Sequence, residues 1–185
     1  VGFTAQALGA NDNKESIRIL YRGLIIAGFL SLIILLSQYF ILEGGLSLTN
    51  SSEEVESLAR EYFYIRVWAA PASLGILVFS GWFIGMQNSV FPMIIAIATN
   101  VFNIGLNFFF VFGLDMKSEG VAYGTLIAQY LSLIIVVILF LSKYKSLLFK
   151  AKIRVLMQWH KLKRFTQVNR DIFIRTLGII FVFSF

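Results

Sequence analysis

Asparagine side chains recur along one face of an uncharged segment in the middle of the chain. Asn100, Asn103 and Asn107 are spaced i, i+3, i+7, which places them within an arc of about 60° on an α-helix. An amide inside a membrane needs a hydrogen-bond partner, so such a stripe either joins two helices or lines a cavity that binds an ion or polar solute. We favour the cavity and keep helix packing as the alternative.

A second polar face follows in the next uncharged segment. Thr125, Gln129 and Ser132 lie at i, i+4, i+7 on one helical face, and Gly120 and Gly124 allow a neighbouring helix to approach closely. A lone hydroxyl in such a helix more often bonds to its own backbone. However, only the connection over residues 115–118 separates the two segments, so their helices are expected to be neighbours. The sequence therefore predicts one shared pocket formed by both polar faces.

An earlier uncharged segment carries residues that shape a helix. Pro71 lies at an interior helical position, where it removes a backbone hydrogen bond and favours a kink, either passive or used as a hinge. Gly81 and Gly85 are four residues apart, a spacing that favours close helix packing over ligand contact.

Residues that carry catalysis are scarce. The uncharged segments contain no Asp, Glu, His or Lys, the single histidine is His160 in a basic segment, and the chain contains no cysteine. The sequence also lacks the motifs of serine hydrolases, zinc peptidases and phosphate-binding loops. We therefore expect no enzyme activity, no catalytic residue, no metal site and no cofactor.

Composition places these polar faces in a membrane. Hydrophobic residues make up 58% of the chain and charged residues 14%, whereas soluble domains have about 45–50% and about 25%. The stretches 23–42, 67–114 and 120–142 contain no charged residue, and one membrane-spanning helix needs about 20 apolar residues. The predicted fold class is an all-α, multi-pass transmembrane helical bundle.

Turn-forming residues divide the chain into predicted elements. Transmembrane helices are expected over about 16–43, 54–88, 92–114 and 119–142, followed by a basic linker over 143–168 and the start of a further helix over 169–185. Because the last uncharged run has only ten residues and the chain opens on valine, we interpret the sequence as a fragment.

Basic residues predict the orientation in the membrane. One side receives Lys14, Arg18, Arg22 and the ten basic residues from 143 to 175, whereas most acidic residues fall on the other side. Positive charge is retained in the cytoplasm, so residues 1–22 and 143–175 are expected there. The basic segment is therefore interpreted as contacting lipid headgroups, and no nucleic acid is expected as a partner.

Several motifs, taken in order, resemble the multidrug and toxic compound extrusion (MATE) family, most closely its DinF-like branch. They are Gly2-Phe3-Thr4-Ala5-Gln6-Ala7, Tyr62-Phe63 with Arg66 and Ala70-Pro71, Gly81-Trp82-Phe83 with Gly85-Met86-Gln87-Asn88, Asn100 with Asn103-Ile104, Gly120-Val121-Ala122 with Gly124-Thr125 and Gln129, and Asn169-Arg170-Asp171-Ile172. The resemblance implies that residues 1–10 end the second helix of a twelve-helix transporter, that the next four helices belong to its amino-terminal lobe, and that residues 169–185 begin the seventh.

The resemblance also implies a function. MATE transporters export amphipathic organic compounds by alternating access, in exchange for H⁺ or Na⁺. Their polar residues on the fifth and sixth helices match Asn103, Asn107 and Thr125 here, and they act with an acid on a first helix that this chain lacks. At Asn107 many relatives carry an aspartate, and an amide cannot take up and release a proton.

The expected partners are the lipid bilayer of the plasma membrane, a small organic substrate and the remainder of the transporter. Two alternatives stay open. One is a lipid-linked saccharide flippase of the same wider fold, whose cavity should hold several cationic residues. The other is a non-transporting membrane scaffold or a degenerate fragment.

Overall fold

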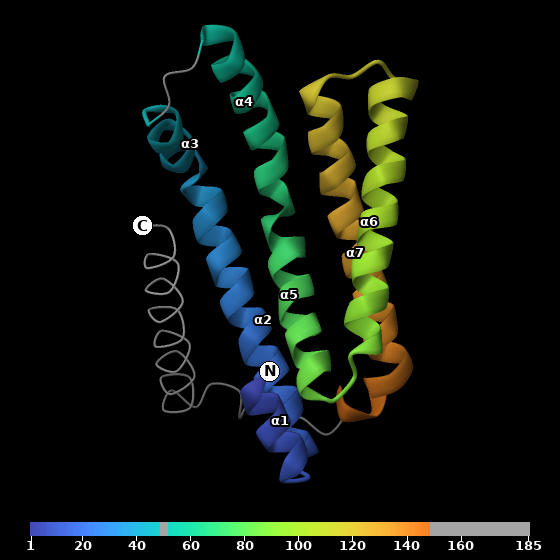
Figure 1. Ribbon diagram of the computed structural model, residues 1–185. Coiled ribbons are helices and arrows are strands. Elements are labelled where there is room, and N and C mark those ends of the chain that lie inside the picture. The colour runs from blue at the N-terminus through green and yellow to red at the C-terminus, as the bar shows by residue number, and fades with distance from the viewer. Residues whose placement is uncertain (49–51, 149–185) are drawn as a thin grey trace, which may run out of the picture. The chain divides into compact units, whose positions relative to one another are not determined.

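The computed structural model describes residues 1–48 and 52–148. Within them the chain forms helices joined by short turns and no strand (Figure 1). In order they are α1 (Gly2–Gly9), α2 (Asn13–Leu36), α3 (Gln38–Leu46), α4 (Glu53–Arg66), a 3₁₀ turn (Val67–Ala69), α5 (Ala70–Gly85), α6 (Val90–Phe108), a π-helical turn (Phe109–Gly113) and α7 (Ser118–Leu148). The predicted linker beyond residue 148, His160 and the predicted helix over 169–185 lie outside the described residues.

Four helical stretches are long and apolar enough to cross a membrane. They cover Asn13–Leu36, Glu53–Gly85, Val90–Gly113 and Ser118–Leu148, and each exceeds the roughly 20 residues that one crossing needs. The predicted all-α, multi-pass fold class is therefore confirmed.

The first of these helices is shorter than the sequence indicated. A single helix was expected over 16–43, but α2 ends at Leu36 and α3 begins at Gln38. Ser37 between them has φ −92° and ψ 4°, and serine is a weak helix former that often marks such interruptions. At its other end α2 is capped by Asp12, whose side chain accepts a hydrogen bond of 2.9 Å from the backbone N–H of Glu15.

Pro71 lies at the start of a helix in the structure, whereas the sequence indicated a helix interior. The expected helix over 54–88 is divided into α4 and α5 by the 3₁₀ turn, and Pro71 is the second residue of α5. At this position the missing N–H of proline would have no helical partner in any case. The tighter 3₁₀ turn thus accommodates the ring.

The connections from α5 to α6 and from α6 to α7 are tight turns. Gln87 adopts a left-handed backbone with φ 58° between α5 and α6, and Asp115 does so with φ 55° between α6 and α7. The side chain of Asn88 accepts a hydrogen bond of 3.3 Å from the N–H of Phe91. These turns make α6 run antiparallel to both α5 and α7 (Figure 1).

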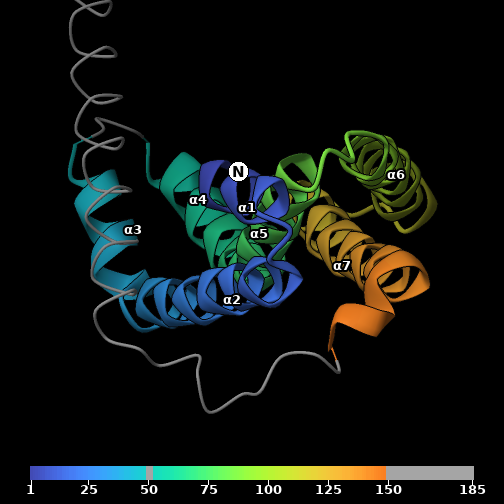
Figure 2. The same cartoon turned by 90° about the horizontal axis from the view of Figure 1, so that it is seen from below.

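Helix α7 holds the described part of the bundle together. It packs against α4, α5 and, most extensively, α6, while α2 packs on α5 (Figure 2). At one end of the bundle an aromatic cluster joins α5 and α7, with the ring centroids of Trp82 and Tyr144 4.9 Å apart and those of Phe79 and Phe140 5.5 Å apart. The packing of α7 against α4 and α5 determines which of its faces is left to meet α6.

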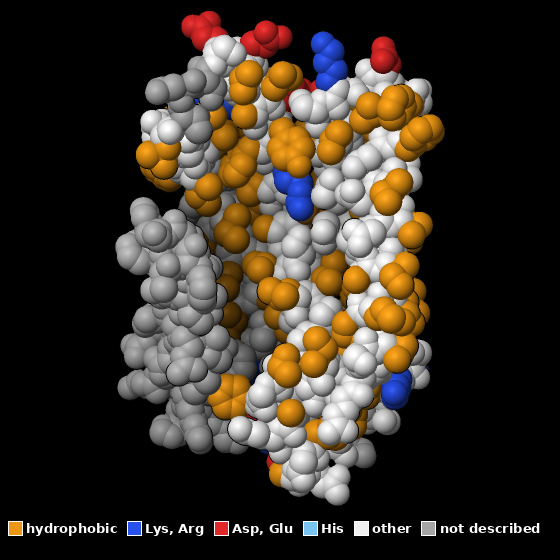
Figure 3. Space-filling model, in the orientation of Figure 1, with side chains coloured by type: hydrophobic (Ala, Val, Ile, Leu, Met, Phe, Trp, Pro, Cys, Tyr) orange, Lys and Arg blue, Asp and Glu red, His pale blue; other side chains and the backbone are white. Residues whose placement is uncertain are grey.

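The two ends of the bundle differ in charge. On the face shown in Figure 3, acidic side chains gather at the end where α4 begins and where the α6–α7 turn lies. Lys14, Lys143 and Lys145 belong to the opposite end, where α2 begins and α7 ends (Figure 1). Bundles that cross a membrane commonly show such a separation.

Candidate functional site

A row of three polar side chains crosses from α6 to α7, and we call it the polar line. The Nδ2 of Asn107 donates to Oδ1 of Asn103 at 3.1 Å, and the Nδ2 of Asn103 donates to Oγ1 of Thr125 at 2.9 Å. Oγ1 of Thr125 in turn donates a hydrogen bond of 2.8 Å to the carbonyl oxygen of Val121. The predicted adjacency of the two polar faces is therefore observed for these residues, and it takes the form of interhelical hydrogen bonds.

The polar line ends in an unsatisfied acceptor. Oδ1 of Asn107 is buried and has no hydrogen-bond partner among the described residues. A Cβ atom at Gly124 would overlap this oxygen and come within 3.0 Å of the Asn107 backbone nitrogen, so the absence of a side chain at Gly124 allows the close approach. An amide oxygen with free lone pairs can accept a hydrogen bond or serve as a ligand of a hard cation.

Asn100 and Gln129, one helical turn from Asn103 and Thr125, line a groove between α5, α6 and α7. The groove has a volume of about 330 Å³. Its lining residues are Ser73, Ile76, Leu77, Ser80, Pro92, Ile95, Ala96, Thr99, Asn100 and Gln129. Of the five residues predicted to form one pocket, Asn100 and Gln129 line the groove, and the other three form the polar line along the same two helices.

The groove combines an apolar wall with a few uncharged polar groups. Asn100 is exposed and Gln129 half-buried, and none of the lining residues is charged. Small-molecule sites are commonly of this kind, with an apolar surface and a small number of polar groups that fix orientation. The groove can therefore hold one face of an amphipathic molecule.

Three residues on the groove were missed from the sequence. Thr99 lies at the α6–α7 contact, where its Oγ1 is 2.8 Å from Oγ of Ser132. It precedes Asn103 by four residues on α6. Ser73 and Ser80 are seven residues apart on α5, so they lie on one helical face. That spacing was a usable signal, but single hydroxyls in helices so often bond to their own backbone that it carries little weight alone.

The residues assigned to packing or hinge roles take distinct positions. A Cβ atom at Gly85 would come within 2.8 Å of the carbonyl oxygen of Val1 and collide with Thr4 of α1. At Gly81 the nearest atom would be 3.9 Å away, which is ordinary van der Waals contact. Close packing of α5 against α1 therefore depends on Gly85. Pro71 precedes the groove residues along α5.

No cluster of three or more potential metal ligands occurs within the described ranges 1–48 and 52–148.

Comparisons with known proteins agree on one family. The model of the MatE family matches residues 2–109. The chain is 35% identical over 177 residues to DNA damage-inducible protein F of Escherichia coli (strain K12), which covers 95% of the chain and 38% of that protein. It is 29% identical over 139 residues to the probable multidrug resistance protein NorM of Listeria monocytogenes serotype 4b (strain F2365), covering 73% and 30% respectively.

A plant relative extends the comparison. Protein DETOXIFICATION 43 of Arabidopsis thaliana is 31% identical over 124 residues, covering 67% of the chain and 23% of that protein. The chain thus spans less than two fifths of the length of each of these relatives.

Proposed function

The chain belongs to the MatE family and is DinF-like in sequence, and on this premise we propose that it forms part of an exporter of drug-like small molecules. Its bilayer-spanning helices make it a multi-pass membrane protein. In the proposal, export is coupled to the entry of H⁺ or Na⁺ and proceeds by alternating access rather than by enzymatic chemistry. The relative named as a multidrug resistance protein supports drug-like compounds as substrates.

The polar line between α6 and α7 is the observation that carries this proposal. It ends in Oδ1 of Asn107, a buried acceptor that has no hydrogen-bond partner within the described part of the chain. Polar groups buried in membrane-spanning helices are energetically unfavourable, and those that occur commonly mark the path of an ion or substrate. In the proposal this oxygen contacts the coupling ion, either Na⁺ directly or a protonated acid from another helix of the transporter.

The groove supplies the proposed substrate contact. Ile76, Leu77 and Ile95 offer apolar surface, while the amides of Asn100 and Gln129 offer donors and acceptors. An amphipathic organic molecule matches both kinds of surface. Thr99 lines the groove and also contacts α7 through Ser132, so it provides a physical connection between substrate and the α6–α7 interface.

The two alternatives make different demands on the same residues. A lipid-linked saccharide flippase would need cationic side chains facing its pathway, and the groove described here has none. A membrane scaffold would use the polar line for packing alone and would transport nothing. We therefore retain export as the function that the geometry supports best.

The proposed location is the plasma membrane, with residues 1–22 and 143–175 on the cytoplasmic side. The basic residues of α2 and of the end of α7 lie at one end of the bundle, which supports this orientation.

Efflux of a cationic dye tests the proposal. Ethidium efflux would be measured in an efflux-deficient bacterium that expresses the complete reading frame, at matched protein levels. We expect N103L and N107L each to slow efflux about tenfold or more, because they remove the polar line. Q38L is the matched control, since Gln38 is a half-buried amide on α3, away from α6 and α7.

Two outcomes would contradict the proposal separately. If the unmodified protein exports no dye from a panel of organic cations, transport itself is wrong. If it exports dye and N103L and N107L do so equally well, the assignment of the polar line is wrong.

A further inference from the structure

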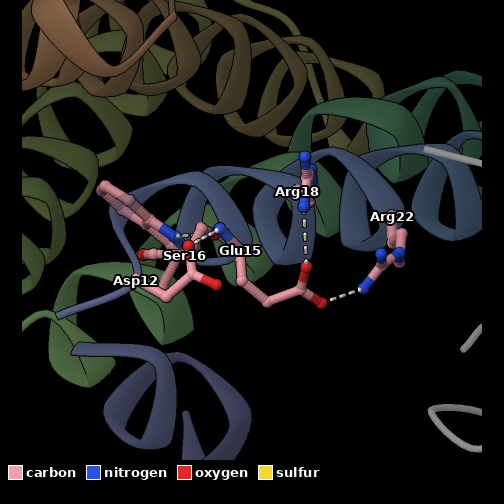
Figure 4. A network of polar contacts seen from close by, with 6 residues as sticks. Asp12, Glu15, Ser16, Arg18 and Arg22 are labelled. Carbon is pink, nitrogen blue, oxygen red and sulfur yellow. Dashed lines mark hydrogen bonds and ion pairs between the residues drawn. The ribbon is translucent and has the colours of Figure 1, made fainter. Parts of the chain in front are cut away.

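Two arginines share one carboxylate near the start of α2. Nη1 of Arg22 lies 2.9 Å from Oε1 of Glu15, and Nη1 of Arg18 lies 3.4 Å from Oε2 of the same side chain. Figure 4 shows the Glu15 carboxylate between the two guanidinium groups. We call these three residues the Glu15 cluster. Within the described ranges, Arg18 and Arg22 both pair with this carboxylate.

Part of each guanidinium group is unsatisfied. Nε and Nη2 of Arg22 and Nε of Arg18 are buried and have no hydrogen-bond partner among the described residues. Arg22 as a whole is only 3% exposed. Donors of a charged group that are removed from water and left unpaired are strongly unfavourable, so this arrangement calls for a ligand.

The unsatisfied atoms of Arg22 form a complete binding edge. Nε–H and Nη2–H point in parallel from one side of the planar guanidinium group, which matches two oxygens of a phosphate or carboxylate. The opposite side, through Nη1, is occupied by Glu15. A second oxyanion can therefore bind Arg22 without breaking the existing ion pair.

The described acidic residues cannot supply this oxyanion locally. Besides Glu15, only Asp12 lies at this end of α2, and its side chain caps the helix by accepting from the N–H of Glu15. The other described carboxylates belong to α3, α4, the α6–α7 turn and the first turn of α7, at the opposite end of the bundle. The partner must therefore come from outside the described residues.

The position along α2 indicates the chemistry of the partner. Arg22 is the last charged residue before the uncharged stretch 23–42, so its guanidinium lies at the level where the apolar part of the helix begins. Phosphate groups are the oxyanions concentrated at that level of a bilayer. Lys14 on α2 and Lys143 and Lys145 on α7 add positive charge at the same end.

We propose that the Glu15 cluster binds a phosphate oxyanion through the Nε–Nη2 edge of Arg22, with Nε of Arg18 as a further donor. The phosphate comes either from an anionic phospholipid headgroup or from free phosphate. Burial strengthens these charge-assisted hydrogen bonds because little water competes for them. The site is separate from the polar line and does not depend on the proposed transport function.

Ligand binding to the purified 185-residue chain tests the proposal. Retention of phosphatidylglycerol and of phosphatidylcholine would be compared by native mass spectrometry, and inorganic phosphate would be titrated in a thermal-shift assay. R22Q removes the binding edge, whereas R22K keeps the charge without the edge. K14Q is the matched control, because it removes one exposed positive charge from the same end of α2.

We expect the loss of phosphate affinity in the variants to depend on the shape of the side chain at residue 22 rather than on its charge alone. R22Q should weaken phosphatidylglycerol binding about tenfold and R22K at least about threefold, while K14Q changes it less than about twofold. If phosphatidylglycerol alone shows this dependence, the ligand is a headgroup. If millimolar inorganic phosphate raises the unfolding temperature of the wild type and not of R22Q, free phosphate is a ligand.

Equal effects of R22Q and K14Q on every ligand would overturn the proposal, as would the absence of phosphate and phosphatidylglycerol binding in the wild type. R18Q guards against a folding defect in R22Q, because it leaves the Arg22–Glu15 pair in place. It should still weaken binding about threefold in a protein that elutes as a single species.

Discussion

Asn107 of α6 lies directly against Gly124 of α7. A Cβ atom at residue 124 would overlap the amide oxygen of Asn107 and come within 3.0 Å of its backbone nitrogen. This contact brings the two helices close enough for Asn103 to reach Thr125 at 2.9 Å. The missing side chain at Gly124 is thus a condition for the polar line.

Replacing this glycine should destabilise the helix pair. We expect G124A to lower the free energy of unfolding in detergent by about 1–3 kcal/mol, because a methyl group there forces α6 away. G105A is the matched control, since Gly105 on α6 has no atom within 4 Å of an added Cβ. G105A should be neutral or stabilising by up to about 1 kcal/mol, and equal losses in both variants would contradict the prediction.

The hydrogen bond between Asn103 and Thr125 should appear as an energetic coupling. In a double-mutant cycle of N103A and T125V, we expect a coupling free energy of about 0.5–1.5 kcal/mol in unfolding experiments. The same cycle between N103A and S132A is the control, because no hydrogen bond joins Asn103 to Ser132 in the described residues. A coupling near zero for both pairs would show that the polar line contributes no interhelical stability.

Trp82 should attach α5 to α2 through its indole nitrogen. Nε1 of Trp82 donates to the backbone oxygen of Ser16 at 2.9 Å, and the side chain is 3% exposed. W82F removes this hydrogen bond and part of the ring, so we expect a loss of about 2 kcal/mol in unfolding free energy.

The control for W82F is W68F, because Trp68 is 53% exposed. We expect W68F to change stability by less than about 0.5 kcal/mol in detergent. Comparable losses from both substitutions would show that the α2–α5 contact does not depend on the indole.

The ion pair between Glu43 and Arg60 should make stability depend on pH. Nη2 of Arg60 lies 3.1 Å from Oε2 of Glu43, and a second bond joins the same groups. The hydrogen bonds from Arg60 hold the pKa of Glu43 below its ordinary value. A lowered pKa in the folded state stabilises the fold above the pKa of the unfolded chain, and this contribution is lost as pH falls through the folded pKa.

Unfolding temperatures of the wild type and E43Q between pH 3 and pH 7 would measure this effect. The wild type should lose more stability than E43Q as the pH falls, and 1 M salt should reduce the difference, because the pair is at the surface. E53Q is the control, since Glu53 is exposed and forms no ion pair among the described residues. Parallel pH profiles of wild type and E43Q would refute the prediction.

The polar line could be anticipated from the sequence because its determinants are local. The spacing of Asn103 and Asn107 puts both amides on one helical face, and the short turn at Asp115 makes α6 and α7 neighbours. The contribution of α5 to the groove that Asn100 and Gln129 line could not be anticipated. It depends on how α5 packs beside α6 and α7, and no local pattern specifies that arrangement.

The interruptions of the helices could not be predicted from the sequence either. Ser37 divides the expected first helix, and the 3₁₀ turn before Pro71 divides the second. At Ser37 the uncharged run 23–42 continues across the interruption, so hydropathy indicates one helix. Only the backbone geometry distinguishes a continuous helix from two consecutive ones.

The sequence by itself determined that this is a multi-pass membrane protein of the MatE family, because apolar content, charge distribution and motif order are properties of the chain alone. The tertiary structure decided which polar atoms are paired and which remain free. Within the described residues, Oδ1 of Asn107 and the Nε–Nη2 edge of Arg22 have no hydrogen-bond partner, and Asn107 packs directly against Gly124. Hydrogen bonds form over about 3 Å, and only the packed helices define distances on that scale.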